Sequence, residues 1–559
     1  MKTTVISNGS ELKTVVDYFY QWEKTQPDKV FLRQPFGKKF KDFTWAETGE
    51  QVRRLAGYLV SLGLEPQSNI GLVSKNCAEW IIADLAIMMS GHVSVPFYPT
   101  LTGEQLNQVL THSGCQVLFV GKIDNWQGMK KGIPTGVSCI SFPTYNPDPE
   151  HVQWDDILAY SKPMTESPRP KLDDLFSIVY TSGTTGNPKG VMLTYKAMAK
   201  VMHVTQDMML YHLPETRFFS YLPLCHIAER NVVAVTAVGT GGTIYFAESL
   251  DTFAANLAAA QPTHFFAVPR IWTKFQLGIL AKMPQKKLDM LLKIPILSGI
   301  IKKKIRKGLG LNEAKFILTA AAPMPVSLIT WFRRLGIKIQ EAYGMTENMG
   351  AVCMAPADAP KDGTVGKLYP GVEVKIMPDT GEILTRAEWN MIGYYKEPQM
   401  TSETIDDEGW IHTGDVGEID SEGYIKITGR VKEMYKTSKG EYVAPSQIEF
   451  GFADNKLIEQ ICVVGQSLPQ PIALVVLSEI ARAVERDAVT QSLAATLSDV
   501  NPKLKSYERV QKIVVMREAW TVDNNMLTPT MKTKRNVIEK TYGQMMEPWY
   551  EGKENVIWE

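Results

Sequence analysis

The chain has little cysteine, no excess of either charge, and no low-complexity tract or internal repeat. Its six cysteines are scattered over 559 residues without Cys-x-x-Cys spacing, a pattern typical of reduced, buried thiols in a cytosolic protein. Basic and acidic residues balance at 60 each, which argues against a protein that binds nucleic acid through a basic surface. We therefore expect no nucleic-acid partner.

A secretory signal and a membrane span are also absent from the sequence. Residues 1–20 contain neither an uninterrupted apolar core nor a small-residue cleavage site. The longest apolar stretch, Trp80–Tyr98, is interrupted by Asp84 and His92 and is more typical of a buried helix followed by a strand. The sequence predicts a cytoplasmic protein.

Helical and strand patterns alternate through the first 360 or so residues. This βαβ rhythm predicts an α/β fold, with a large N-terminal domain of mostly parallel sheets covered by helices on both faces. The clearest predicted helices are 51–62, 78–89 and 103–111, and the clearest strands are 69–73, 92–96 and 116–120.

The pattern changes near residue 365, where short strands begin to alternate with Gly, Asp and Pro turns. We interpret residues 365–428 as a small β subdomain. After the charged run Gly429–Met434 an α+β pattern begins, with helices expected at Pro445–Ala453 and Ile480–Leu497. Because the chain is too long for one core, we predict an N-terminal domain, 1–431, and a small α+β C-terminal domain, 432–559.

The most informative segment is Tyr180–Gly190, Tyr-Thr-Ser-Gly-Thr-Thr-Gly-Asn-Pro-Lys-Gly, which follows an apolar strand. Glycines let backbone N–H groups approach a ligand closely, and the hydroxyls and the lysine add donors for phosphate oxygens. The segment departs from the Walker A pattern because Lys189 follows Pro188 and precedes Gly190. It is either a nucleotide site outside the P-loop class or an ordinary polar turn.

Four further motifs follow in order: Gln340–Glu347, Trp410–Asp415, Thr428–Arg430 and Leu527–Lys534. With them, the chain resembles the adenylate-forming (ANL) superfamily of AMP-binding acyl-CoA synthetases over nearly its whole length. The resemblance implies that ATP and Mg²⁺ convert a carboxylic acid to an acyl-AMP with loss of pyrophosphate, after which CoA takes the acyl group. Charge develops at the α-phosphorus, so oriented cations and donors are needed there.

The resemblance implies which residues bind the phosphates of ATP and the metal ion. Glu347 is expected at Mg²⁺, which uses few carboxylates, and Thr346 at the α-phosphate. Taken alone, this pair would be a helix N-cap followed by an exposed glutamate. The residues expected around the β- and γ-phosphates are Thr181, Ser182, Gly183, Thr184, Thr185, Gly186 and Lys189.

The nucleoside contacts also follow from the resemblance. Asp415 is expected to accept hydrogen bonds from both ribose hydroxyls, with Arg430 as a second ribose contact, although a lone Gly-Asp pair is more often a turn. The adenine is expected beside Tyr343 and the backbone of residues 320–323, where Thr-Ala-Ala-Ala-Pro replaces a glycine-rich stretch. The expected residues of this pocket are Ala321, Ala322, Pro323, Glu341, Ala342, Tyr343 and Gly344.

In the family that the chain resembles, the C-terminal motif, here Leu527–Lys534, contains a catalytic lysine. Lys532 is expected to contact the carboxylate and the α-phosphate in the first half-reaction, with Lys534 as the fallback and a solvated basic tail as the alternative. Lys432 corresponds to a hinge about which the mobile C-terminal domain would rotate between half-reactions. The residues expected on the CoA side after that rotation are Lys436 and Gly440.

Two features bear on the acid. Gly344 stands where short-chain relatives have a pocket-closing tryptophan, which we interpret as opening a channel for a medium or long acyl chain. Residues 221–230 and 262–270 resemble the long-chain fatty acid–CoA ligase branch, in which His226 borders the acyl-adenylate; a structural histidine is the alternative. We reject a metal at His226-x-x-Glu229 because no further ligands cluster there.

Residues 291–307 combine apolar side chains with a basic cluster. This stretch could contact an anionic membrane peripherally, on its inner face, but a solvated helix face is the interpretation we prefer.

Two rival functions remain. One is a fatty acyl-AMP ligase that loads a carrier protein, and the other is a non-catalytic nucleotide- or lipid-binding homologue. The joint presence of Lys189, Glu347, Asp415, Arg430 and Lys532 argues against the second. The sequence indicates neither the preferred length of the acyl chain nor the oligomeric state of the protein.

Overall fold

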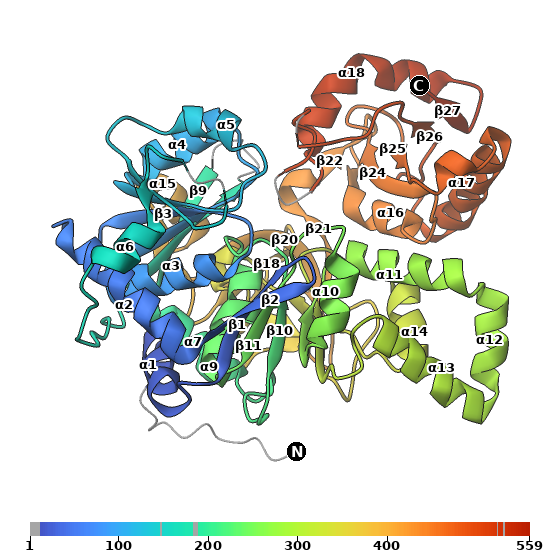
Figure 1. Cartoon of the computed structure of the whole chain (residues 1–559). Helices are drawn as coiled ribbons and strands as arrows, with labels where there is room; N and C mark the ends of the chain where they lie inside the picture. The colour runs from blue at the N-terminus through green and yellow to red at the C-terminus, as the bar shows by residue number, and fades with distance from the viewer. Residues whose placement is uncertain (1–11, 146–147, 183–187, 523, 529–531) are drawn as a thin grey trace.

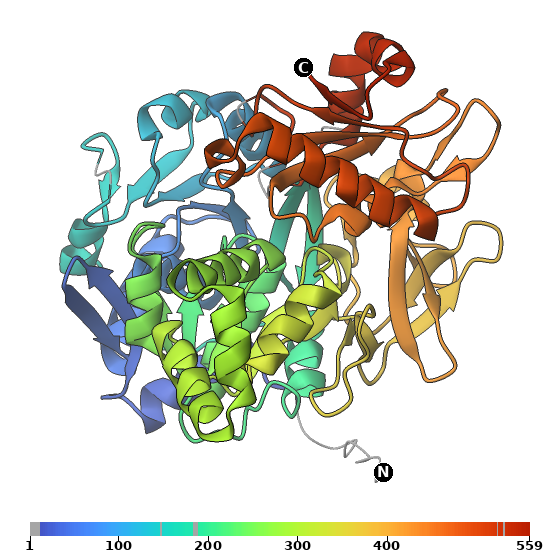
Figure 2. The ribbon, with the colours of Figure 1, turned by 90° about the vertical axis from the view of Figure 1, so that its right-hand side faces the viewer.

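The computed structural model describes residues 12–145, 148–182, 188–522, 524–528 and 532–559. A large N-terminal part contains two extended sheets, and a smaller C-terminal part contains a four-stranded sheet of its own. Figures 1 and 2 show the small part seated on one side of the large one. The predicted α/β class, with a large N-terminal and a small C-terminal domain, is confirmed.

An eight-stranded sheet carries the glycine-rich segment. Strand β8 continues to Ser182, beyond the predicted strand end, and turns back as β9, so that Thr181 pairs with Lys189. The described residues at the two ends of the candidate phosphate loop, 181–182 and 188–189, therefore pair with each other in an antiparallel ladder. In spatial order the strands are β19 (Gly393–Tyr394), β9 (Pro188–Thr194), β8 (Leu175–Ser182), β4 (Val93–Phe97), β3 (Asn69–Val73), β5 (Val117–Val120), β6 (Ser138–Ser141) and β7 (Val152–Gln153).

The second sheet has thirteen strands, and its central strands run parallel. In order they are β17 (Glu373–Ile376), β18 (Glu382–Arg386), β20 (Ile411–Ile419), β21 (Tyr424–Arg430), β16 (Gly366–Leu368), β15 (Cys353–Met354), β14 (Gln340–Tyr343), β13 (Phe316–Thr319), β12 (His264–Phe266), β10 (Arg217–Ser220), β11 (Thr243–Phe246), β1 (Val30–Phe36) and β2 (Lys39–Thr44).

The short strands predicted as a β subdomain are present, but they are continuous with this large sheet. Strand β14 pairs antiparallel with β15, β15 with β16, and β16 with β21. The pairing of β20 with β21 places Asp415 directly opposite Arg430. Two motifs that lie 15 positions apart in the sequence thus become neighbours across one ladder.

Helices cover the sheets, and several begin at threonine caps. The side chains of Thr14, Thr44 and Thr102 accept a hydrogen bond from the first turn, and the third helical residue reaches back in a capping box. The longer helices of the N-terminal part are α1 (Val15–Thr25), α2 (Trp45–Ser61), α3 (Ala78–Met89), α4 (Gly103–Ser113), α6 (Trp154–Tyr160), α7 (Tyr195–Thr205), α10 (Phe253–Ala260), α11 (Pro269–Lys282), α12 (Gln285–Lys293), α13 (Pro295–Gly308), α14 (Val326–Arg334) and α15 (Pro398–Thr404).

The C-terminal part packs helices against its four-stranded sheet. The helix predicted from Ile480 begins only at Arg486, because a 3-10 turn, Ala481–Ala483, precedes it. The elements are β24 (Ile458–Val464), β25 (Ile472–Leu477), β26 (Lys512–Val515), β27 (Val556–Trp558), α16 (Pro445–Phe452), α17 (Arg486–Val500) and α18 (Arg535–Glu551), with a hairpin of β22 (Tyr435–Lys436) and β23 (Tyr442–Val443).

Polar contacts join the two parts. Arg270 on α11 forms an ion pair with Glu459 on β24, and Ser327 on α14 donates a hydrogen bond to Asp454. Both Arg270 and Glu459 keep solvent exposure, so this contact stabilises the arrangement only weakly. No helix among the described residues has both the length and the apolar character needed to cross a bilayer.

Candidate functional site

The carboxyl ends of β13 and β14 define one edge of the site. These strands are parallel neighbours, so the segment after Thr319 and the end of β14 at Tyr343 emerge side by side, where open α/β sheets bind ligands. Ala321, Ala322 and Pro323 are exposed there. Ala321 has φ 72°, a left-handed conformation that glycine adopts more easily, at the position where the resemblance has a glycine-rich stretch.

Asp415 lies at the centre of a hydrogen-bonded trio. Its Oδ1 accepts from Arg430 Nε at 2.6 Å, and its Oδ2 accepts from the Tyr343 hydroxyl at 2.7 Å. Asp415 is only 7% exposed and is part of strand β20, so the alternative of a turn aspartate does not apply. Each carboxylate oxygen retains a lone pair for a further donor, as a ribose diol would provide.

A tyrosine that the sequence analysis missed joins the phosphate and metal candidates. The Tyr394 hydroxyl donates to Glu347 Oε1 at 2.7 Å, and the Lys189 ammonium lies 5.0 Å from the centre of the Tyr394 ring. Glu347 and Thr346 are both buried in a 3-10 turn, which differs from an N-cap with an exposed glutamate. Tyr394 belongs to a strand of only two residues, Gly393–Tyr394, which is too short to show a periodic pattern in the sequence.

Burial, followed by the positive charge of Lys432, lowers the pKa of Lys189, while Glu347 acts in the opposite direction. Lys189 and the candidate metal carboxylate therefore share one electrostatic environment. The predicted loop residues Gly183, Thr184, Thr185 and Gly186 lie outside the described residues, whereas Ser182 pairs with Pro188 in the ladder between β8 and β9.

Lys532 enters the site from the C-terminal domain. Its backbone is held by Thr528, which donates its N–H to Lys532 O at 2.8 Å and accepts from Lys532 N through its hydroxyl at 3.0 Å. Lys532 is exposed to solvent, so protein atoms desolvate its ammonium only in part. Burial and then Arg430 lower the pKa of Lys532, while Asp415 and Glu347 raise it.

The other C-terminal candidates lie elsewhere. The Lys534 ammonium donates to Asn525 Oδ1 at 2.5 Å within its own domain. Lys432 is exposed in a 3-10 turn, Val431–Glu433, between the two domains. Lys436 lies over the Tyr442 ring in the β22–β23 hairpin, and Gly440 is at its exposed turn, so neither belongs to the cluster around Asp415 and Lys532.

His226 caps the short helix α8 (Ile227–Glu229), and its Nδ1 accepts from the Ala228 N–H at 3.2 Å. Burial, with the charge of Lys532 as the smaller cause, lowers the pKa of His226 to about 4. The imidazole is therefore neutral at pH 7, and this hydrogen bond assigns its proton to Nε2. His226 thus combines a structural cap with a donor nitrogen.

Glu229 supports the end of strand β10. Its Oε1 accepts from the Ser220 hydroxyl at 2.9 Å and from the Tyr221 N–H at 3.0 Å, and burial raises its pKa to about 8. Burial likewise raises the pKa of Glu341 to about 8. Across the described part of the chain, no three His, Cys, Asp or Glu side chains gather to hold a metal ion.

The interpretation that Gly344 opens a channel is wrong. A Cβ on Gly344 would lie 2.3 Å from the carbonyl carbon of Gly350, so backbone already fills the space beside this residue. An apolar cavity of about 40 Å³ lies instead between α7 and a π-helical turn, η2 (Arg230–Val235). Its walls include Met198, Met202, Val232 and Met349, and Met349 is two residues beyond Glu347 in the sequence.

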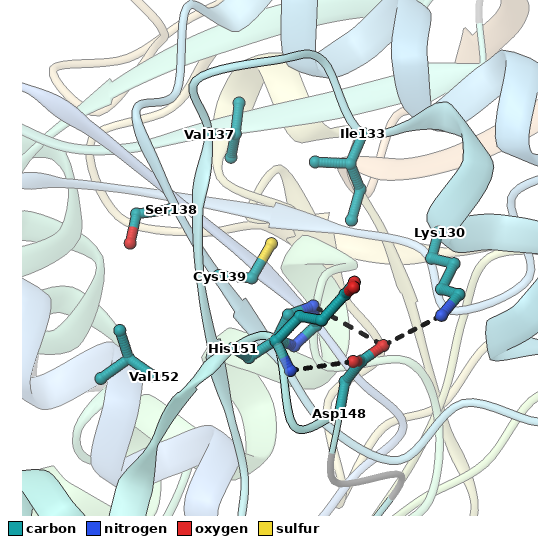
Figure 3. Close-up of a pocket in the computed structure, with 9 residues that line it drawn as sticks. Lys130, Ile133, Val137, Ser138, Cys139, Asp148, His151 and Val152 are labelled. Atoms are coloured by element: carbon teal, nitrogen blue, oxygen red, sulfur yellow. Dashed lines mark hydrogen bonds and ion pairs between the residues drawn. The ribbon is translucent and has the colours of Figure 1, made fainter.

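A larger cavity, of about 340 Å³, lies at the β6–β7 edge of the eight-stranded sheet (Figure 3). Three of its ionisable groups lie together: Asp148 accepts from Lys130 at 3.2 Å and lies 4.0 Å from the His151 ring nitrogen. None of the residues predicted for nucleotide or acyl binding lines this cavity.

Comparison with protein families assigns both parts of the chain. The profile of the AMP-binding enzyme family matches residues 19–395, and that of the AMP-binding enzyme C-terminal domain matches residues 433–554. The chain therefore belongs to the AMP-binding enzyme family, and its predicted membership in the adenylate-forming superfamily is confirmed.

Several characterised proteins are similar over nearly the full length. Long-chain-fatty-acid–CoA ligase FadD15 of Mycobacterium tuberculosis is 29% identical, covering 97% of both chains. Long-chain-fatty-acid–CoA ligase 5 of Rattus norvegicus is 28% identical, covering 98% of this chain and 90% of the relative.

Solved structures show the same fold at lower identity. The adenylation domain of a carboxylate reductase from Mycobacterium chelonae superposes with a TM-score of 0.81 at 22% identity, covering 97% of this chain and 92% of that one. The corresponding domain from Segniliparus rugosus, in complex with AMP and a carboxylic acid, gives 0.79 at 21% identity, covering 97% and 94%.

Proposed function

We propose that this protein is a cytoplasmic long-chain fatty acid–CoA ligase that forms AMP. It activates a medium- or long-chain fatty acid with MgATP to an acyl-AMP, releasing pyrophosphate, and then transfers the acyl group to CoA. The relatives named as long-chain-fatty-acid–CoA ligases support the reaction and the class of acid.

The proposal rests mainly on the position of Lys532 near candidate site residues of the N-terminal domain. A lysine from the C-terminal domain shares its electrostatic environment with Asp415, Arg430 and Glu347, and lowers the pKa of His226. A site for adenylation needs positive charge where the acid's carboxylate meets the α-phosphate. Lys532 supplies that charge, and the neutral His226 can donate from Nε2 to an oxygen of the acyl-adenylate.

The residues present fit ATP and magnesium. Asp415 keeps acceptor capacity for the ribose, the exposed Ala321–Pro323 segment borders the Tyr343 end of β14, and Lys189 supplies positive charge for the phosphates. Magnesium would be held by Glu347 together with oxygens of the nucleotide and water, where it would neutralise phosphate charge. Tyr394 orients the Glu347 carboxylate for this contact.

The acid is proposed to enter the cavity behind Met349. Its 40 Å³ is room for little more than one water molecule, so the walls must separate when an acyl chain binds. Four methionines line it: Met198, Met202, Met209 and Met349. Methionine side chains are flexible and can adapt to an inserted chain.

Pyrophosphate release tests the function directly. The purified protein is incubated with MgATP and fatty acids of increasing chain length, with and without CoA. Release that yields acyl-CoA supports the ligase. Release without a CoA thioester would indicate an acyl-AMP ligase serving a carrier protein, and no release with any acid would indicate a binding protein.

Filling the cavity should shorten the preferred acid. Val232→Trp places an indole in it, and we expect activity on a long-chain acid to fall roughly 10- to 100-fold relative to an eight-carbon acid. Val204→Trp is the control, because Val204 is half-buried on α7 but does not line the cavity. An equal loss with both acids in Val232→Trp would exclude the cavity as the acyl site.

Removing the charge of Asp415 should weaken ATP binding. We expect Asp415→Asn to raise KM for ATP by about 10- to 100-fold, since a hydrogen bond to a charged group contributes about 1.5–3 kcal/mol. Steady-state pyrophosphate release measures it. Asp420→Asn is the matched control, because Asp420 follows the same strand but pairs with Lys361 at the surface. An unchanged KM in Asp415→Asn would contradict the ribose role.

A further inference from the structure

Helices α12 and α13 form an arm that projects from the N-terminal part at the right-hand edge of Figure 1. The inner side of the arm is anchored, since Leu288 is fully buried and Ile301, Ile305 and Leu309 pack against the core beneath. The arm is therefore a folded part of the domain, and none of the described elements covers the exposed apolar residues on its outer side.

Large apolar side chains crowd the corner where α12 meets α13. Ile296 is 79% exposed, Ile300 58% and Met290 57%, and Ile294 and Leu297 beside them are also exposed. Isolated exposed apolar residues are ordinary, but five within eleven positions at one projecting corner form a patch that calls for an apolar partner.

The same face of α13 turns from apolar to basic. Ile296, Ile300, Lys303 and Lys307 follow one another at intervals of three and four positions, which places them on one side of the helix, and all are exposed. Lys304 is exposed beside them. An apolar tip with a basic band behind it is the pattern of a helix lying in a membrane interface.

The charge of the arm is uncompensated. Residues 285–308, which make up the two helices, contain eight lysines and arginines and one carboxylate, Asp289, although the whole chain is balanced. Asp289 is already paired with Arg334. Within the described part of the chain, no carboxylate forms an ion pair with Lys303, Lys304 or Lys307. The partner that fits must therefore be both anionic and apolar.

We propose that the α12–α13 corner docks on an anionic lipid bilayer. Ile294, Ile296 and Ile300 enter the boundary between headgroups and acyl chains, and the lysines contact acidic headgroups. A nucleic acid would satisfy the lysines but leave the isoleucines in water. Docking of this corner on a bilayer does not depend on the ligase activity. Its proposed benefit, which is that the enzyme can take fatty acids from the bilayer, rests on the proposed function.

Co-sedimentation of the full chain with vesicles tests the docking. We expect binding to phosphatidylcholine vesicles that contain phosphatidylglycerol, weak binding to phosphatidylcholine alone, and a decline with salt. Lys303→Glu/Lys304→Glu/Lys307→Glu should lower the partition coefficient by roughly 100-fold, since each lysine near an anionic surface contributes about fivefold. Ile296→Ser/Ile300→Ser should also release the protein.

Matched variants control for charge and for apolarity. Lys503→Glu/Lys540→Glu/Lys553→Glu makes the same change of net charge at exposed lysines of the C-terminal domain, and Leu250→Ser removes a side chain that is 88% exposed elsewhere. Both should bind like the parent. If the parent fails to bind anionic vesicles, or if control and arm variants lose binding equally, the proposal is overturned.

A second measurement locates the contact. All six native cysteines are buried, so a polarity-sensitive dye can be attached selectively after Ile296→Cys. We expect its emission to shift to the blue with anionic vesicles. No shift, or a blue shift without vesicles that follows protein concentration and particle mass, would overturn the proposal, the latter indicating a second copy at this surface. Because neither assay needs ATP, failure of docking and failure of ligase activity are distinguishable.

Discussion

Replacing Lys532 with alanine is expected to lower acyl-adenylate formation by about 100- to 1,000-fold, the loss typical of removing one preorganised donor from a reacting centre. Thioester formation from supplied acyl-AMP should be largely spared, because the proposed rotation removes Lys532 from the site before CoA attacks. The two half-reactions are measured separately, as pyrophosphate release without CoA and as acyl-CoA formation from synthetic acyl-AMP.

Lys534→Ala is the matched control. Lys534 is two positions away, but its ammonium is bonded to Asn525 within the C-terminal domain. We expect this variant to retain both half-reactions. Equal losses of both half-reactions in Lys532→Ala would contradict its assignment to adenylation, and a selective loss in Lys534→Ala would transfer the role to Lys534.

The assignment of Lys532 also predicts the direction in which adenylation changes with pH. Burial holds the pKa of Lys532 below its usual range, and the role requires the charged ammonium. Adenylation should therefore decline with rising pH earlier than an ordinary lysine would lose its proton. Lys532→Arg keeps the charge to higher pH, so its residual activity should lack this alkaline decline.

Elements with strong local signals could be predicted closely. Strand β3 and helix α3 have the predicted bounds, since an apolar run of five residues and a continuous apolar helix leave little freedom. The start of α17 could not be predicted well, because the apolar Ile480 precedes a separate 3-10 turn, Ala481–Ala483, and not the helix itself. Local patterns do not report where tertiary packing interrupts a helix.

Contacts between distant segments were the harder part of the site. The sequence order of the motifs identified Asp415 and Arg430, but their pairing depends on the ladder between β20 and β21. Tyr394 was missed because its role comes from two partners distant in the sequence, Lys189 on the neighbouring strand β9 and Glu347 in the 3-10 turn Thr346–Asn348. Gly344 was misread because the backbone that fills its space comes from six residues downstream.

The second large effect is expected at the hinge. Lys432 is part of a 3-10 turn, where φ is close to the value that proline imposes, so Lys432→Pro is compatible with the conformation of that residue. Proline fixes φ at residue 432, whereas domain rotation requires the few hinge residues to change φ and ψ. We expect Lys432→Pro to spare adenylation and to block thioester formation.

The size of the block follows from backbone strain. A residue forced into an unfavourable φ/ψ region costs about 1–3 kcal/mol, so the rotated state should become roughly 5- to 150-fold rarer, and acyl-CoA formation should fall with it. The polar contacts between the domains, such as Arg270 with Glu459, are exposed and weak, so the backbone of the hinge dominates this balance.

Lys432→Ala separates the side chain from the backbone. Alanine removes the ammonium beside Lys189 but keeps the freedom to rotate, so we expect acyl-CoA formation close to that of the parent. Pyrophosphate release and acyl-CoA formation are measured on all three proteins. Normal overall turnover in Lys432→Pro would exclude rotation about this residue. An equal block in Lys432→Ala would assign the effect to the lost charge, because proline, unlike alanine, fixes φ at residue 432.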